Sequence, residues 1–116
     1  MAEIAVKELE IAKSTLDEHK AEDILVVDVS ETSPFASYVV IATCLNPRAL
    51  GAMKDILEEE FLKAAVEVPV KEGEADSGWV IVQGGDVIVH LFLEGNRRQV
   101  NLEGLLTLIA DKHKKN

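Results

Sequence analysis

Cysteine is almost absent from this 116-residue sequence. The single cysteine, Cys44, cannot form a disulfide within the chain, which excludes a disulfide framework. Long apolar runs are missing too, since none approaches the roughly 20 residues that a membrane-spanning helix needs. The segment MAEIAVKELE at the N-terminus carries acidic residues where a secretory signal has a basic region and an apolar run. We therefore expect a cytoplasmic protein without a secretory signal.

Basic residues are also scarce. Twelve Lys and Arg residues stand against 21 Asp and Glu residues, which gives a formal net charge of −9. This charge repels phosphate backbones and attracts basic surfaces. It disfavours bare nucleic acid as a partner and favours a basic protein, including one that itself sits on nucleic acid. The alternative is that the charge only keeps the protein soluble.

Three segments have the pattern of amphipathic helices. The first covers residues 3–19, where apolar residues recur at steps of three and four. The second begins at Asn46, a good N-cap, followed by Pro47 at the first helical position, and runs to about Ala65. The third runs from an Asn101 cap to about Lys112, and the basic residues at its end suit the negative end of the helix dipole.

Strand-forming runs lie between these helices. Ile24–Val29 and Tyr38–Cys44 are continuous apolar runs separated by a turn with Ser, Thr and Pro. Val66–Val70 resembles a short strand, and Pro69 places it at the edge of a sheet because proline cannot donate to a ladder.

The stretch GWVIVQGGDVIVHLFLEG, residues 78–95, predicts a β-hairpin. With Gly84 and Gly85 as the two central turn residues, Trp79 would lie opposite His90, and Phe92 would be diagonal to the indole. These side chains share one face of the hairpin. The other face is all aliphatic and is predicted to join the core; it consists of Val80, Val82, Val87, Val89 and Leu91.

The elements follow the order α-β-β-α-β-β-β-α over residues 1–116. This order predicts a single α/β (α+β) domain with a mixed five-stranded sheet and helices. Two long helices can cover one sheet face, but the short third helix cannot cover all of the other. We expect the uncovered part to carry Trp79, His90 and Phe92, and an exposed patch of this kind marks an interface.

Catalytic chemistry has weak support in the sequence. His90 could act as a general base, but Asp86 lies four residues away, ~13 Å along an extended strand, and cannot orient the imidazole. We interpret His90 as packed against Trp79, and Asp86 as a turn residue bonded to nearby backbone.

Metal and cofactor sites are not predicted. The acidic run of Glu72, Glu74 and Asp76 lacks the spacing of a calcium loop and is interpreted as solvated. Cys44 has no nearby histidine or basic cluster and is interpreted as a buried inert thiol. Arg97 and Arg98 are either solvated surface or anchors for a carboxylate, a phosphate or a partner carbonyl.

Several motifs together resemble the iojap-like ribosomal silencing factor family over nearly the whole chain. They are SPFASYVVIAT, Arg48 shortly after it, GWVIVQGGDVIVHLF, and RRxxxLE from Arg97 to Glu103. The resemblance implies nucleotidyltransferase-like topology without catalytic residues. It also implies a protein that binds a basic protein on the intersubunit face of the large ribosomal subunit and sterically blocks subunit joining when nutrients are scarce, and that forms a homodimer when free.

We expect the partner-binding surface to combine these motifs with the uncovered sheet face. His90, Asp86 and Arg48 are expected to have structural or secondary roles in it. In the RRxxxLE segment, Val100 stands where the family commonly has an aromatic residue. The residues expected to contact the partner are Trp79, Phe92, Arg97, Arg98, Val100, Leu102 and Glu103.

Two alternative functions remain. The first is a divergent metal-dependent nucleotidyltransferase or other small-molecule enzyme that uses Asp28, Asp86 and His90. Such enzymes need paired carboxylates to hold metal, and the first strand offers only Asp28. The second alternative is a homodimeric interaction module with an unrelated partner.

Overall fold

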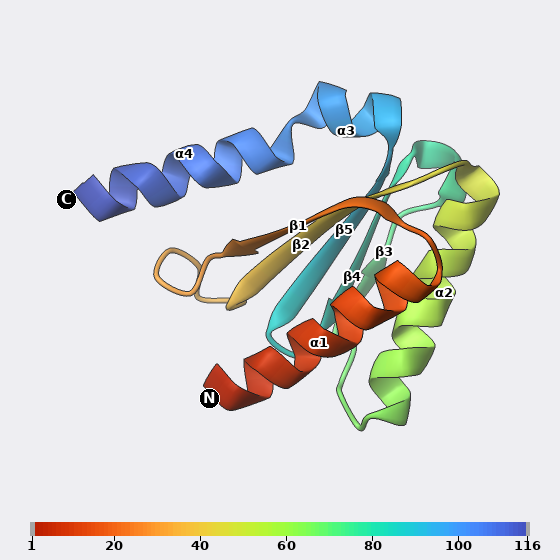
Figure 1. Ribbon diagram of the computed structural model, residues 1–116, viewed down its shortest axis with the longest axis horizontal. Coiled ribbons are helices and arrows are strands. Elements are labelled where there is room, and N and C mark those ends of the chain that lie inside the picture. The colour runs from red at the N-terminus through yellow and green to blue at the C-terminus, as the bar shows by residue number, and fades with distance from the viewer. Residues whose placement is uncertain (1, 116) are drawn as a thin grey trace.

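The computed structural model describes the backbone of residues 2–115 and the side chains of residues 6–108. Helices are interspersed with groups of strands along the chain (Figure 1). In order they are α1 (Ala2–Glu18), β1 (Glu22–Asp28), β2 (Tyr38–Cys44), α2 (Pro47–Lys63), β3 (Val70–Glu72), the 3₁₀ turn η1 (Ala75–Ser77), β4 (Trp79–Gly84), β5 (Val87–Leu93), α3 (Glu94–Val100) and α4 (Leu102–Lys115).

The five strands form one mixed sheet in the order β1-β2-β5-β4-β3, which confirms the predicted fold class. The two central strands, β2 and β5, are parallel, and Tyr38 pairs with Val87. The other neighbours are antiparallel. The parallel pair requires a long crossover, and α2, β3 and β4 together supply it.

Helices α1 and α2 cover one face of the sheet (Figure 1). The aliphatic side of the hairpin lies beneath them and is fully buried, as predicted. From α2 the core receives Leu50, Met53, Leu57 and Phe61, which repeat at helical spacing. The predicted cap is confirmed, since the Asn46 side chain accepts a hydrogen bond from the Ala49 amide at 2.8 Å.

The opposite face is covered over only part of its width. A smaller core forms there from Val29, Ala36, Val39, Ile41 and Phe92. Leu102 and Leu106 of α4 pack against it, and α4 contacts β1 at the sheet edge. Apart from the buried Phe92, the side chains of this face on β4 and β5 remain half-buried: Trp79, Ile81, Gln83, Ile88 and His90. We call these five residues the open strip.

The predicted register of the hairpin is wrong by two residues. Trp79 pairs with Phe92, and Gly84 is the last residue of β4, paired with Val87. The turn residues are Gly85, with φ +56°, and Asp86. A Cβ on Gly84 would lie 2.6 Å from the Phe61 ring, so this glycine permits close packing of α2 instead of forming the turn. A shift of two leaves the faces unchanged.

The edge strand is shorter and later than predicted. Val66 and Glu67 do not belong to it, because the Val66 amide donates to the Phe61 carbonyl and closes the end of α2. The Glu67 carbonyl accepts from the Gly85 amide. Pairing with β4 starts only at Val70, after Pro69, and β3 lies at the sheet edge as expected.

A short helix, α3, was not predicted between the hairpin and the last helix. Asn101 ends it in the left-handed conformation, with φ 49° and ψ 46°, and its amide donates to the Arg97 carbonyl. Asn101 was predicted to cap the start of the last helix, and the structure adds that it also ends α3. The side chains of the basic end of α4, from Lys112 onward, lie outside the described residues.

Candidate partner-binding surface

Three rings form a cluster where the open strip meets α3. The indole of Trp79 stacks on Phe92, with ring centroids 5.1 Å apart and an interplanar angle of 25°. The ring of His90 lies 5.9 Å from the indole. Trp79 Nε1 donates a hydrogen bond to His90 Nδ1 at 3.1 Å. Phe92 and His90 therefore hold the indole in one orientation, and part of its surface remains exposed.

His90 serves this cluster as a neutral acceptor. Burial lowers the pKa of His90 from 6.5 to about 4, because the charged imidazolium would lose its solvation. A ring that accepts at Nδ1 carries its proton at Nε2. The structure thus confirms that His90 packs beside Trp79, with the correction that the pair is diagonal across the strands.

Phe92 corrects another expectation. It was predicted on the uncovered face, but the side chain is completely buried in the smaller core. Phe92 therefore supports the indole from beneath and is not available to a partner directly. The uncovered face is real, but it is narrower than predicted and consists of the open strip.

Arg97 ties three parts of the fold together. Its Nε and Nη2 atoms contact the Glu103 carboxylate of α4 at 3.1–3.2 Å. Its Nη1 atom donates to the Asp23 carbonyl of β1 and to Thr43 Oγ1 of β2, both at 2.8 Å. Only 12% of the side chain is exposed. Arg97 and Glu103 therefore fix α3 and α4 to the end of the sheet, a role that the adjacent arginines did not reveal in the sequence.

The remaining predicted contact residues differ in their exposure. Arg98 and Val100 are exposed on α3, and Val100 retains 40% of its accessible surface. Leu102 is half-buried against the smaller core. Arg48 is exposed in the first turn of α2. Thus the predicted set separates into exposed side chains and side chains that position them.

Sequence reasoning missed a buried carboxylate at the opposite end of the hairpin. Glu8 of α1 is only 6% exposed, and its Oε1 atom accepts a hydrogen bond from the Asp86 amide at 2.7 Å. The Asp86 carbonyl accepts from the amides of Ser37 and Tyr38. Asp86 is thus a turn residue, as predicted, but these bonds come from its backbone amide and carbonyl, and its side chain is exposed. An acid at an inward position of an amphipathic helix was the available signal for Glu8.

The three residues of the enzyme hypothesis are not brought together. Asp28 of β1 pairs with Tyr38 of β2, which in turn pairs with Val87 of β5. Two strand spacings, about 10 Å, therefore separate Asp28 from Val87. His90 lies three residues further along β5. Asp28 Oδ1 instead accepts from the amide and hydroxyl of Ser30, at 2.9 and 2.6 Å.

Other candidate chemistry is absent from the part of the chain that the structure describes. No three His, Cys, Asp or Glu side chains there are placed to hold a metal ion. The acidic residues Glu72, Glu74 and Asp76 are exposed. Cys44 is buried, as predicted, and burial raises the pKa of its thiol to about 11, which disfavours the reactive thiolate. Among the described helices none is long and apolar enough to cross a bilayer.

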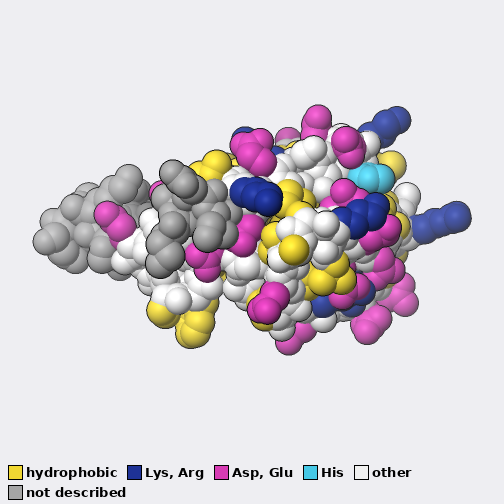
Figure 2. Space-filling model, turned by 90° about the horizontal axis from the view of Figure 1, so that it is seen from below, with side chains coloured by type: hydrophobic (Ala, Val, Ile, Leu, Met, Phe, Trp, Pro, Cys, Tyr) yellow, Lys and Arg dark blue, Asp and Glu magenta, His cyan; other side chains and the backbone are white. Residues whose placement is uncertain are grey.

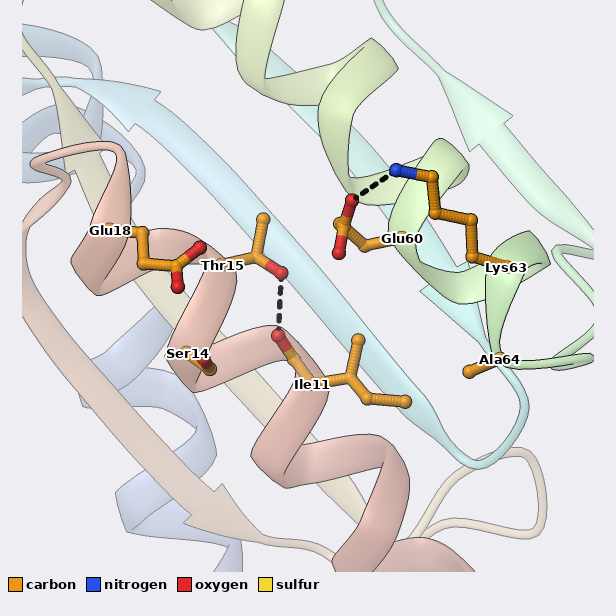
Figure 3. A pocket seen from close by; sticks show the side chains of 7 residues that line it. All are labelled: Ile11, Ser14, Thr15, Glu18, Glu60, Lys63 and Ala64. Atoms are coloured by element: carbon orange, nitrogen blue, oxygen red, sulfur yellow. Dashed lines mark hydrogen bonds and ion pairs between the residues drawn. The ribbon is translucent and has the colours of Figure 1, made fainter.

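A shallow pocket between α1 and α2 lies on the helical layer (Figure 3). Thr15 Oγ1 donates to the Ile11 carbonyl at 2.7 Å, and Lys63 pairs with Glu60 at 3.3 Å. Both interactions stay within a single helix. Because this pocket lies under neither Trp79 nor α3, it is separate from the candidate surface.

Fold and site together define a small α/β domain whose candidate site is a partly exposed aromatic surface beside the short helix α3 and the start of α4. The chain belongs to the ribosomal silencing factor family: the family model described as "Ribosomal silencing factor during starvation" matches residues 2–116. This match confirms the resemblance seen in the sequence motifs.

Individual relatives agree with this assignment. The ribosomal silencing factor RsfS of Bacillus subtilis is 33% identical over 97 residues, which are 84% of this chain and 82% of that protein. The mouse protein named mitochondrial assembly of ribosomal large subunit protein 1 is 32% identical over 87% of this chain and 46% of its own. A crystal structure of a Chromobacterium violaceum protein, 27% identical, superposes with a TM-score of 0.82 and covers 87% of this chain and 84% of that one.

Proposed function

We propose that this protein binds a basic protein on the intersubunit face of the large ribosomal subunit and sterically blocks joining of the small subunit. In this role it represses translation under nutrient limitation and acts without catalysis. The observation that carries the proposal is the partly exposed indole of Trp79 on the open strip of an acidic chain from the ribosomal silencing factor family.

The names of the relatives support the choice of partner. The Bacillus subtilis protein is named for ribosomal silencing, and the mouse protein for assembly of the large ribosomal subunit. A net charge of −9 favours a basic protein over exposed RNA. Acidic side chains are spread over much of the described surface visible in Figure 2, with Lys and Arg among them.

We infer two roles among the predicted contact residues. Trp79, Arg98 and Val100 would touch the partner, because these side chains are at least partly exposed. Their positioning depends on groups beneath them. The supporting residues are Phe92, Arg97, Leu102 and Glu103, with His90 holding the indole through its hydrogen bond.

The physical logic is that of an interface hot spot. A tryptophan that is already oriented loses little side-chain freedom on binding, and the energy of such interfaces concentrates in a few aromatic and arginine residues. Arg98, one position from the largely enclosed Arg97, supplies a planar donor at the rim. We further propose that the free protein is a cytoplasmic homodimer.

The test is sedimentation of the purified protein with isolated large ribosomal subunits. Trp79→Ala should abolish co-sedimentation, whereas Trp79→Phe, which keeps the ring stacked on Phe92, should retain part of it. Leu62→Ala is the matched control, because Leu62 is 57% exposed on α2, away from the open strip. Circular dichroism checks that each variant is folded. Undiminished binding by the Trp79→Ala protein would contradict the proposal.

A second measurement addresses the mechanism. Purified small and large subunits are mixed with and without the protein, and the fraction that associates is followed by sucrose-gradient sedimentation. The protein should lower this fraction, and Trp79→Ala should restore it. Binding to large subunits without any effect on association would refute the steric mechanism and leave the partner intact.

A further inference from the structure

The loop between β1 and β2 presents an aromatic side chain to solvent. Phe35 is 75% exposed, although burying a phenylalanine contributes roughly 1.5–3 kcal/mol. An exposed large apolar residue alone is ordinary on protein surfaces. Phe35 is different because the backbone on both sides of it is fixed.

Hydrogen bonds hold the chain at Phe35 itself. Its amide donates to Ser33 Oγ at 3.1 Å. Its carbonyl accepts from Gln83 Nε2 at 3.2 Å, and the same Gln83 nitrogen donates to the Gly85 carbonyl at 2.9 Å. The loop is thus bonded to Gln83 of β4, 48 positions further along the sequence and next to the hairpin turn.

The next residues continue this anchoring. Ala36 is buried in the smaller core, and the Ser37 amide donates to the Asp86 carbonyl at 2.8 Å. On the other side, the Val29 amide donates to the Ser37 carbonyl at 2.9 Å. The Phe35 ring is therefore presented from an ordered support, which reduces the entropy lost on binding.

Phe35 lies at the far end of the open strip from Trp79. Gln83, which holds the Phe35 carbonyl, is the last residue of the open strip on β4, and Trp79 is the first. The two positions are four residues apart, or ~13 Å along the strand. Between them the strip is half-buried and largely apolar, through Ile81 and Ile88. An aromatic residue therefore stands at each end of one continuous face.

The charge around Phe35 is acidic. The loop contributes Glu31 and the hairpin turn contributes Asp86, both exposed. Neither segment 28–38 nor segment 83–88 contains a lysine or an arginine. Lys7 lies on the α1 side of the same turn, where Glu67 accompanies it. A partner that approaches this end therefore meets a negative rim around an apolar centre, which matches a basic protein surface.

We propose that Phe35 is a second aromatic anchor of the partner-binding surface, and that it enters an apolar pocket rimmed by Lys and Arg side chains on the large-subunit protein that Trp79 contacts. This inference rests on the proposed function. It extends the contact along the whole open strip, so that binding depends on both ends of β4.

The experiment measures the affinity of the full-length protein for isolated large ribosomal subunits by co-sedimentation over a range of protein concentrations. Phe35→Ala should weaken binding about tenfold or more, as expected for a hot-spot aromatic residue, without lowering the midpoint of thermal unfolding. Leu62→Ala truncates another exposed apolar side chain, 57% exposed on the opposite layer, and should bind as the parent does. Glu31→Lys should weaken binding too, and most strongly at low salt.

The outcomes separate the two proposals. If Phe35→Ala binds as tightly as the parent while Trp79→Ala fails to bind, the second anchor is refuted and the proposed function stands. If the unmodified protein does not sediment with large subunits, both are refuted. If Phe35→Ala changes only the self-association of the free protein, measured by analytical ultracentrifugation, the anchor belongs to contacts between copies and the proposal is overturned.

Discussion

Replacing Arg97 by alanine should destabilise the fold far more than the same change at Arg98. The Arg97 guanidinium makes two hydrogen bonds to Glu103 through Nε, an ion pair through Nη2, and one hydrogen bond each to Asp23 and Thr43 through Nη1. Thr43 is buried, and only 30% of the Glu103 side chain is exposed. Alanine at position 97 would leave Thr43 Oγ1 and the Glu103 carboxylate without the guanidinium donor.

The magnitude follows from these partners. A hydrogen bond to a charged group contributes roughly 1.5–3 kcal/mol, and partial exposure of the pair places the value near the lower end. With the loss of the contacts to Asp23 and Thr43, we expect a decrease of about 2–4 kcal/mol in the free energy of unfolding. For a domain of this size that corresponds to roughly 8–16 °C in Tm. Arg98→Ala should change the free energy by less than about 0.5 kcal/mol.

Urea and thermal denaturation followed by circular dichroism would measure these differences. Arg97→Lys should be intermediate, because an ammonium group cannot donate in three fixed directions. In a double-mutant cycle, Arg97→Ala combined with Glu103→Ala should cost less than the sum of the single changes, by about 0.5–3 kcal/mol. Equal unfolding midpoints for Arg97→Ala and Arg98→Ala would refute the structural role assigned to Arg97.

Two further predictions concern the hairpin. An unfolded histidine binds a proton below about pH 6.5, whereas His90 in the folded protein does so only near pH 4. The free energy of unfolding should therefore fall by up to about 3 kcal/mol as the pH drops through this range. His90→Phe should flatten that part of the profile of stability against pH, and an unchanged profile would contradict the role of His90. Gly85→Ala should cost more than about 1 kcal/mol, since φ is +56° and a Cβ would lie 2.0 Å from Glu8 Oε2, whereas Gly95→Ala, with open space around its Cβ, should be neutral or slightly stabilising in denaturant titrations.

Local patterns predicted most of the architecture. The helical spacing of Leu50 to Phe61 and the capping chemistry of Asn46 fix α2 without reference to the rest of the chain. The alternation along β4 and β5 separates core from surface whatever the register, because a shift of two residues preserves the faces. These features depend only on neighbours in sequence.

Features that depend on distant contacts were not predictable. The register of the hairpin is set by Phe61, which needs the space at Gly84, and by Glu8, which fills the space at Gly85. The burial of Phe92 depends on α4 folding back over the smaller core. Likewise, Arg97 and Arg98 look equivalent in the sequence, and only the position of Glu103 beside the first of them separates their roles.

The parallel pairing of β2 with β5 delays completion of the sheet during synthesis. Strand β2 is almost entirely buried in the finished sheet, and β5 covers one of its edges along its whole length. β5 emerges after α2, β3 and β4, which at typical elongation rates of roughly 5–20 residues per second takes a few seconds. Throughout that delay an apolar strand with an unpaired edge is present on the nascent chain, where it can pair with other chains. We expect chaperones that shield nascent chains to raise the yield of this protein.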